Sequence, residues 1–180
     1  MARQRHNIGF MAVEEIAARH GFSPWRNRFK GLVAEGKVGT QKLLLLKPMT
    51  YMNLSGEAVR EAAQFYKIPP AEITLFHDEL DLAPGKIRIK KGGGNAGHNG
   101  LRSTDQQLST PDYWRVRLGI GHPGDKARVT GWVLGDFSKA DQLWLQPLLQ
   151  AMAAEAPLLA AGQRDAFMTR LAAANGPASP

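Results

Sequence analysis

The stretch GKIRIKKGGGNAGHNGLRSTDQQL, residues 85–108, decides the fold class of this chain of 180 residues. Its first part alternates apolar and basic residues, as in IRIKK, and predicts a half-buried β-strand. A glycine-rich loop follows, and HNGLRSTDQQL then predicts a helix. A strand, a loop and a helix in direct succession are typical of an α/β protein.

Helices and strands alternate on both sides of this stretch. The helical spacing of Phe10, Val13 and Ile16 predicts an amphipathic helix over residues 7–20. The other predicted elements are a hairpin (28–35 and 41–47), a helix (55–67), two strands (73–79 and 113–121) and two helices (138–161 and 163–174). We expect a single α/β domain over residues 1–175, with a mixed β-sheet sandwiched between helices because the hairpin is antiparallel. The Gly, Pro, Ala and Ser residues at 176–180 predict a disordered tail.

The composition restricts the class of partner and the compartment. Lys and Arg number 23 against 16 Asp and Glu, a formal charge of +7 that favours a polyanionic partner such as nucleic acid. A basic protein without such a partner fits the charge equally well. The chain has no cysteine, which excludes disulfides and thiolate chemistry. Its apolar runs are too short to span a membrane and its first ten residues are not a signal segment, so we expect a cytoplasmic location.

The glycine loop admits three interpretations. GGGNAG, residues 92–97, satisfies the dinucleotide pattern G-x-G-x-x-G, and an acid, Asp112, lies twenty residues after its first glycine. Against a dinucleotide site, the preceding strand is not continuously apolar, and Asp112 comes before the next strand instead of ending it. A plain spacer is disfavoured by the polar residues Asn95, His98 and Asn99. The third interpretation is the wall of a site for a phosphate-bearing ligand.

Five segments, in chain order, resemble the signature blocks of bacterial peptidyl-tRNA hydrolases. They are RHNIGF (5–10), KPMTYMNLSGEAV (47–59), HDELDLAPGKIRIKKGGGNAGHNGL (77–101), RVRLGIGHPGD (115–125) and VLGDF (133–137). That family cleaves the ester that joins a peptide to the 3′ ribose of tRNA, which recycles tRNA from aborted translation. The resemblance therefore implies a monomeric enzyme that acts on peptidyl-tRNA, with no metal, no other cofactor and no obligate protein partner.

The resemblance also assigns roles to individual residues. His6 matches the catalytic histidine, and an imidazole can take a proton from the water that attacks the ester. Asp78, at the end of a predicted strand, would accept a hydrogen bond from this imidazole and fix its tautomer. The residues that match the substrate-binding cleft are Tyr51, Met52, Asn53, His98 and Asn99. The amides among them can hold the peptide, the water or the oxyanion without changing protonation. Two further residues, Lys90 and Arg117, match the pair that clamps the 5′ phosphate of tRNA.

The pattern of basic residues agrees with a tRNA site. In YWRVRLGIG, residues 113–121, apolar residues alternate with Arg115 and Arg117, which predicts a strand with one basic face. Between residues 86 and 128 nine basic residues stand against three acidic ones. Glycines without side chains would let an RNA backbone approach, and the cations would neutralise its phosphates.

Less specific interpretations remain open for several of these residues. His6 also fits a capping or surface histidine, and Asn53 fits the N-cap of the helix that begins near Ser55. A carboxylate metal cluster is disfavoured, because its members would be close neighbours in one strand and turn, where side chains point in different directions. That cluster would consist of His77, Asp78, Glu79 and Asp81.

The start of the chain departs from the family pattern. Family members begin with an apolar strand that ends in a Gly-Asn-Pro-Gly turn before the catalytic histidine, whereas this sequence has only MARQR before His6. The resemblance thus implies that this strand is lacking here. A competing hypothesis is a non-catalytic RNA-binding protein on the same scaffold. The joint presence of His6, Asp78, Asn53 and Asn99 argues for the enzyme.

Overall fold

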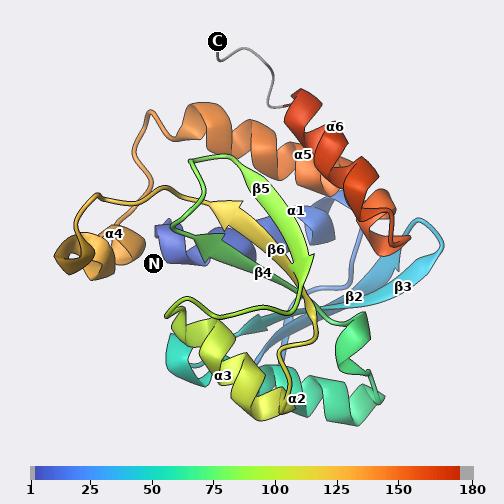
Figure 1. Cartoon of the computed structure of the whole chain (residues 1–180). Coiled ribbons are helices and arrows are strands. Elements are labelled where there is room, and N and C mark those ends of the chain that lie inside the picture. Colours follow the sequence, from blue (N-terminus) through green and yellow to red (C-terminus); the bar gives the residue numbers. More distant parts are fainter. Residues whose placement is uncertain (1–2, 175–180) are drawn as a thin grey trace.

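The structure, a computed structural model that describes residues 3–174, is a mixed α/β domain (Figure 1). The predicted tail, residues 176–180, lies outside the described residues. Two three-stranded sheets form its centre. One contains β1 (Arg26–Arg28), β2 (Gly31–Val38) and β3 (Gln41–Pro48), in that order and antiparallel. The other contains β4 (Thr74–Glu79), β6 (Trp114–Gly119) and β5 (Ile87–Lys91), in the order β4-β6-β5.

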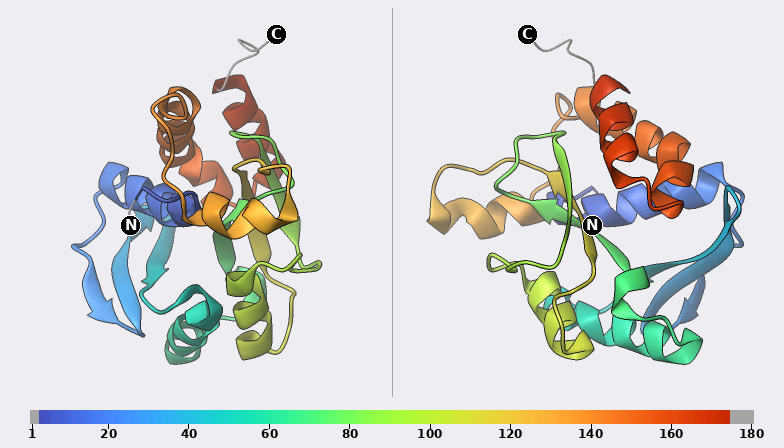
Figure 2. Two further views of the ribbon diagram at one scale, coloured as in Figure 1. Left: turned by 90° about the vertical axis from the view of Figure 1, so that its left-hand side faces the viewer. Right: turned by 45° about the vertical axis from the view of Figure 1, so that its right-hand side comes forward.

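The α/β class is confirmed, but the hairpin does not make the sheet mixed as predicted. The hairpin strands β2 and β3 belong to a sheet of their own. In the other sheet β4 runs parallel to β6 while β5 runs antiparallel to it, so the mixed character comes from β5. Figure 2, left, shows the hairpin standing apart from β4 and β6.

Six helices surround the sheets in the described part of the chain. In Figure 1, α2 (Ser55–Tyr66) and α3 (Asn99–Leu108) lie below the strands, whereas α5 (Gln142–Ala160) and α6 (Arg164–Ala174) lie above them. The short helix α4 (Val129–Leu134) was not predicted, because Val129, Thr130 and Gly131 all have low helix propensity. Tertiary contacts hold it: the Arg5 guanidinium stacks 3.7 Å from the Trp132 ring centroid. Within residues 3–174, no helix is both long and apolar enough to cross a membrane.

Helix α1 (Ile8–Arg19) packs against both sheets. Ile8 and Ala12 belong to a core that includes Leu118 of β6, whereas Val13 and Ile16 belong to a core on the hairpin. Gly9 lets α1 approach β4 closely, since a Cβ at this position would lie 2.3 Å from the carbonyl oxygen of Phe76. This close packing brings the residues that precede α1 to the carboxyl end of β4.

Candidate active site

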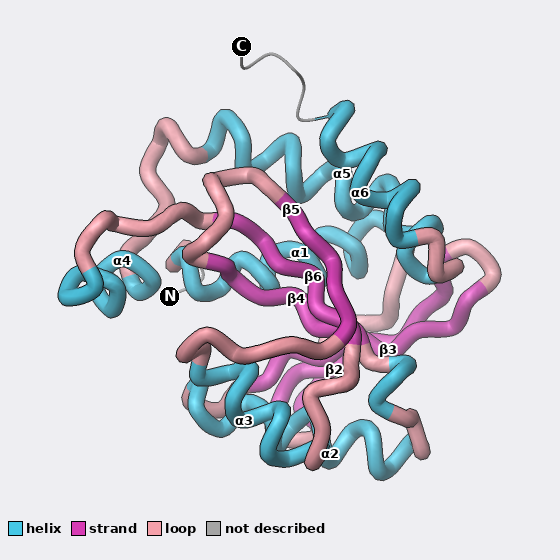
Figure 3. The backbone as a smooth tube through the Cα atoms, viewed as in Figure 1, coloured by secondary structure: helices cyan, strands magenta, loops and turns pink. Residues whose placement is uncertain are grey.

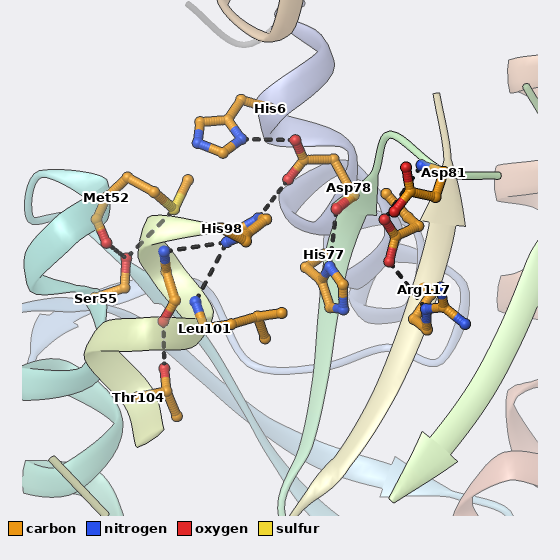
Figure 4. A network of polar contacts seen from close by, with 12 residues as sticks. His6, Met52, Ser55, His77, Asp78, Asp81, His98, Leu101, Thr104 and Arg117 are labelled. Carbon is orange, nitrogen blue, oxygen red and sulfur yellow. Dashed lines mark hydrogen bonds and ion pairs between the residues drawn. The ribbon is translucent and has the colours of Figure 1, made fainter. Parts of the chain in front are cut away.

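Two histidines share one buried carboxylate at the carboxyl end of β4 (Figure 4). His6, in a single 3-10 turn before α1, has its Nδ1 2.7 Å from Oδ2 of Asp78. His98, the N-cap residue of α3, has its Nε2 2.8 Å from Oδ1 of the same carboxylate. The structure therefore brings together three residues that are far apart in the sequence and were all predicted to belong to the site.

The N-terminus of α3 determines the tautomer of His98. Its Nδ1 accepts hydrogen bonds from the backbone N–H groups of Gly100 (3.1 Å) and Leu101 (3.2 Å), so this nitrogen carries the lone pair of a neutral ring. The proton is then on Nε2, which donates to Asp78. Figure 3 shows the loop that leads from β5 into α3, and Figure 4 shows His98 beside Asp78.

Asp78 is ionised in this arrangement. Burial would raise the pKa of its carboxyl group, but the hydrogen bonds from His6 and His98 outweigh that effect and lower the pKa below its usual value. An ionised carboxylate only accepts hydrogen bonds, so Nδ1 of His6 is the donor. The lone pair of a neutral His6 consequently lies on Nε2. A ring in this state can accept a proton from water, as a general base must.

The metal cluster that the sequence disfavoured is not the one that the structure assembles. Among the described residues, the group that could hold a metal ion consists of His6, Asp78 and His98, whose potential ligand atoms lie within 4.8 Å of one another. His77, beside Asp78, belongs instead to the interior. Burial and the neighbouring His98 lower the pKa of His77 to about 4, so its ring is neutral.

A polar pocket with a volume of about 470 Å³ lies between the turn before α2 and the helix α3, and most of the predicted substrate-binding residues line it. Met52 and Asn53 come from the turn before α2, and Asn99 is the first residue of α3. Tyr51, also predicted, is not a lining residue of this pocket and is 83% exposed. The N-cap residue of α2 is Leu54, so the alternative role of Asn53 as the cap is wrong.

Close packing of α2 on α3 fixes the two sides of the pocket relative to each other. The backbone N–H of Gly56 donates to Oγ of Ser103 (2.9 Å), and a Cβ at Gly56 would lie 2.3 Å from the Ser103 carbonyl oxygen. Three residues that the sequence did not single out also line the pocket: Arg102, Ser103 and Gln106. They follow Asn99 by three, four and seven residues, which places them on the same face of α3. This helical spacing could have identified them from the sequence.

The predicted basic face of β6 is wrong for one of its two arginines. Arg115 is fully buried, because the glycine loop and α3 cover it. Its guanidinium donates to the Gly94 carbonyl (2.7 Å) and to Oδ1 of Asp105 (3.0 Å). Arg117 is partly exposed, and its Nε donates to Oε1 of Glu79 (2.9 Å). That bond uses only Nε, so the two terminal nitrogens of Arg117 are the atoms that could bind a phosphate.

Lys90 and Arg117 stand on the same face of neighbouring strands. In the antiparallel pairing of β5 with β6, Lys90 lies opposite Arg115, and Arg88 lies opposite Arg117. Lys90 and Arg117 are therefore diagonal neighbours, a relation in which long side chains remain within reach of one another. Lys90 also extends over the glycine loop, since a Cβ at Gly93 would lie 2.7 Å from its Nζ.

Comparison with known proteins identifies the family. The family model of peptidyl-tRNA hydrolase matches residues 1–178. The peptidyl-tRNA hydrolase of Granulibacter bethesdensis is 69% identical over 172 residues, which are 96% of this chain and 89% of that protein. That of Acidiphilium cryptum is 66% identical over 172 residues, 96% of this chain and 90% of that protein. A crystal structure of peptidyl-tRNA hydrolase from Acinetobacter baumannii has a TM-score of 0.88 at 41% identity, and the match covers 96% of this chain and 88% of that one. The family predicted from the sequence blocks is confirmed: the chain belongs to the peptidyl-tRNA hydrolase family.

Proposed function

We propose that this chain, acting as a monomer, hydrolyses the ester between the peptide and the 3′ ribose of tRNA in peptidyl-tRNA, with His6 as the general base. The observation that carries the proposal is the hydrogen bond from Nδ1 of His6 to the ionised Asp78. It leaves Nε2 of His6 as the proton acceptor and stabilises the imidazolium as it forms. The family membership supports the choice of substrate.

The reaction balances with the groups of this site. A water oxygen attacks the ester carbonyl carbon while Nε2 of His6 takes one of its protons. The carbonyl oxygen becomes an oxyanion, and the side-chain NH₂ groups of Asn53 and Asn99 can donate to it from the pocket walls. When the tetrahedral intermediate collapses, the bond to the 3′ oxygen breaks and His6 returns the proton to that oxygen. The products are the free peptide acid and tRNA.

His98 positions Asp78 and is not a second base. Its Nε2 carries a proton that is donated to Asp78, and its Nδ1 is occupied by two backbone N–H groups. Neither nitrogen of the neutral ring can accept a proton from water. A metal ion at this cluster would have to displace the protons on both histidine nitrogens that face Asp78, whereas the general-base route uses them where they are.

Lys90 and Arg117 are the proposed contacts for the 5′ phosphate of tRNA. Their shared face on β5 and β6 adjoins the glycine loop, where residues 93, 94, 96 and 97 are exposed and a polynucleotide could approach. The bond from Arg117 to Glu79 fixes the guanidinium before tRNA arrives, which reduces the conformational entropy lost on binding.

The test is hydrolysis of an N-blocked aminoacyl-tRNA by His6→Ala, with tRNA binding measured in parallel. We expect turnover to fall by at least about 10³-fold while affinity for tRNA stays within about threefold. His20→Gln, which changes a histidine at the other end of α1, is the matched control and should keep normal turnover. Turnover by His6→Ala close to that of the unchanged protein would refute the mechanism. Tight tRNA binding without hydrolysis by the unchanged protein would favour the non-catalytic RNA-binding alternative.

A further inference from the structure

The block VLGDF, residues 133–137, lies outside the candidate active site, at the end of α4 and in the connection to α5. It packs against the segment in front of α1, and Figure 1 shows α4 beside the start of α1. The backbone N–H of Arg5 donates to the Gly135 carbonyl (3.0 Å). The N–H of Phe137 donates in return to the Arg3 carbonyl (3.0 Å). The two segments thus form an isolated antiparallel bridge.

The side chain of Arg5 reinforces this contact. Its guanidinium stacks 3.7 Å from the centroid of the Trp132 ring, and its Nη1 donates to the Trp132 carbonyl (3.2 Å). Its Nη2 lies 3.6 Å from Oδ2 of Asp141, the N-cap residue of α5. The side chain is only 12% exposed, so solvent ions screen these contacts little. Arg5 therefore ties the segment before α1 to both α4 and α5.

The groups that this guanidinium contacts are themselves held in place. Nε1 of Trp132 donates to the carbonyl of Gly121 (2.9 Å), two residues after the end of β6. The carboxylate of Asp141 accepts hydrogen bonds from the backbone N–H of Ser138 (2.8 Å) and from Nε1 of Trp144 (3.1 Å). The guanidinium consequently rests on a platform that is fixed to the sheet and to the start of α5.

The turn that carries His6 has little stability of its own. It is a 3-10 turn of three half-buried residues, Arg5–Asn7, and the side chain of its N-cap residue, Gln4, forms no capping bond with a described residue. So short a turn forms few hydrogen bonds for the backbone that it orders. Apart from α1, which follows it, two side-chain contacts hold the turn: that of His6 with Asp78 and that of Arg5 with α4 and α5.

We propose that Arg5 is a positioning residue for His6: it holds the turn against α4 and thereby keeps Nδ1 of His6 at hydrogen-bonding distance from Asp78. The inference rests on the proposed function, because it requires His6 to be the general base. Arg5 contacts α4 and α5, whereas His6 contacts β4 (Figure 4). A shift of the backbone between the two residues would move the imidazole, and a displacement of about 1 Å can cost about 10²-fold in rate.

The experiment measures kcat and KM for an N-blocked aminoacyl-tRNA in Arg5→Met, well below the Tm of each variant. Methionine keeps an apolar chain of similar length on Trp132 but has neither the charge nor the donors. We expect kcat to fall by about 10- to 100-fold while KM stays within about threefold. Arg5→Lys keeps the charge without the planar group and should have an intermediate kcat. Arg19→Met, at the exposed last residue of α1, is the matched control and should keep both values.

Double mutants test whether Arg5 acts through His6. In the His6→Ala background, Arg5→Met should cause no further loss of kcat, because the residue that it positions is gone. Trp132→Leu removes the ring on which the guanidinium stacks and should also lower kcat. The double mutant with Arg5→Met should then be no worse than the more impaired single mutant. The ¹⁵N resonance of Nδ1 of His6 should shift in Arg5→Met and not in Arg19→Met.

Three results would overturn the proposal. The first is a normal kcat in Arg5→Met. The second is a loss that appears only in KM, which would make Arg5 a contact for tRNA. The third is a loss from Arg5→Met of equal size with and without His6. Arg5→Lys and Trp132→Leu carry the same test if Arg5→Met does not fold. Normal turnover by His6→Ala would refute the proposed function, whereas its loss together with a normal kcat in Arg5→Met would refute only the role of Arg5.

Discussion

Replacing Asp78 by asparagine separates the two histidines that share its carboxylate. An ionised carboxylate accepts a hydrogen bond from each, but a carboxamide has one oxygen acceptor and one NH₂ donor. His98 cannot change tautomer without losing the bonds from the Gly100 and Leu101 N–H groups to its Nδ1. The oxygen of the new carboxamide therefore turns to His98, and its NH₂ group faces Nδ1 of His6.

The expected loss of activity follows from this tautomer. Once Nδ1 of His6 accepts a hydrogen bond, the proton of the neutral ring is on Nε2, the atom that must take the proton from water. Inverting the tautomer of a catalytic histidine in this way costs about 10⁴-fold in rate, which corresponds to about 5 kcal/mol of transition-state stabilisation. We expect kcat for an N-blocked aminoacyl-tRNA to fall by that factor in Asp78→Asn, with little change in tRNA binding.

A double mutant tests the tautomer argument itself. In Asp78→Asn with His98→Ser, serine can still cap α3, and the amide oxygen is free to accept from His6. Activity should then rise at least about tenfold above that of Asp78→Asn alone, although His98→Ser alone lowers it. A double mutant no more active than Asp78→Asn would refute the reasoning, as would an Asp78→Asn single mutant that retains more than about a tenth of normal activity.

Three further predictions concern packing, charge and pH. Gly56→Ala should lower the free energy of unfolding by about 1–3 kcal/mol and raise KM, because its Cβ would meet the Ser103 carbonyl carbon at 2.5 Å and push α2 from α3. Gly131→Ala, whose Cβ would meet no described atom within 4 Å, should leave both urea denaturation and KM nearly unchanged. Lys90→Ala should weaken tRNA binding and reduce the slope of log K against log salt by about one, whereas Lys37→Ala, on the hairpin sheet, should leave the slope unchanged. The pKa of His77 is about 4 in the folded chain and 6.5 in the unfolded chain, so between pH 4 and 6.5 only the unfolded chain binds a proton at this residue. The contribution of His77 to the free energy of unfolding is therefore complete above pH 6.5 and falls by up to about 3 kcal/mol as the pH drops to 4. In His77→Gln, the free energy of unfolding from urea denaturation should depend less on pH in this range.

Elements with a strong local pattern were predictable from the sequence. The helix expected over residues 7–20 is α1, Ile8–Arg19, and the strand expected over 73–79 is β4, Thr74–Glu79. Apolar spacing along one segment determines such elements, whatever they pack against. The hairpin was predicted for the same reason, although its turn is shorter than expected: β2 continues to Val38 and β3 begins at Gln41.

Features that depend on distant residues were not predictable in the same way. Alternation in β6 places Arg115 beside Arg117 on one face, but burial of Arg115 depends on Gly94 and Asp105, which belong to other elements. The partition into two sheets likewise depends on which strands pair, and no local pattern specifies this. The resemblance predicted that His6, Asp78 and His98 belong to the site. The hydrogen bonds that fix the tautomers of both histidines are seen only in the structure.

The position of Asp78 links the proposed proton transfer to two elements, the start of α3 and the end of β4. The tautomer of His6 depends on Asp78, whose second hydrogen bond comes from a histidine held by the N-terminus of α3. Asp78 itself is buried, one residue before the end of β4. The turn before α1, the end of β4 and the start of α3 must therefore all keep their places for His6 to hold its proton on Nδ1.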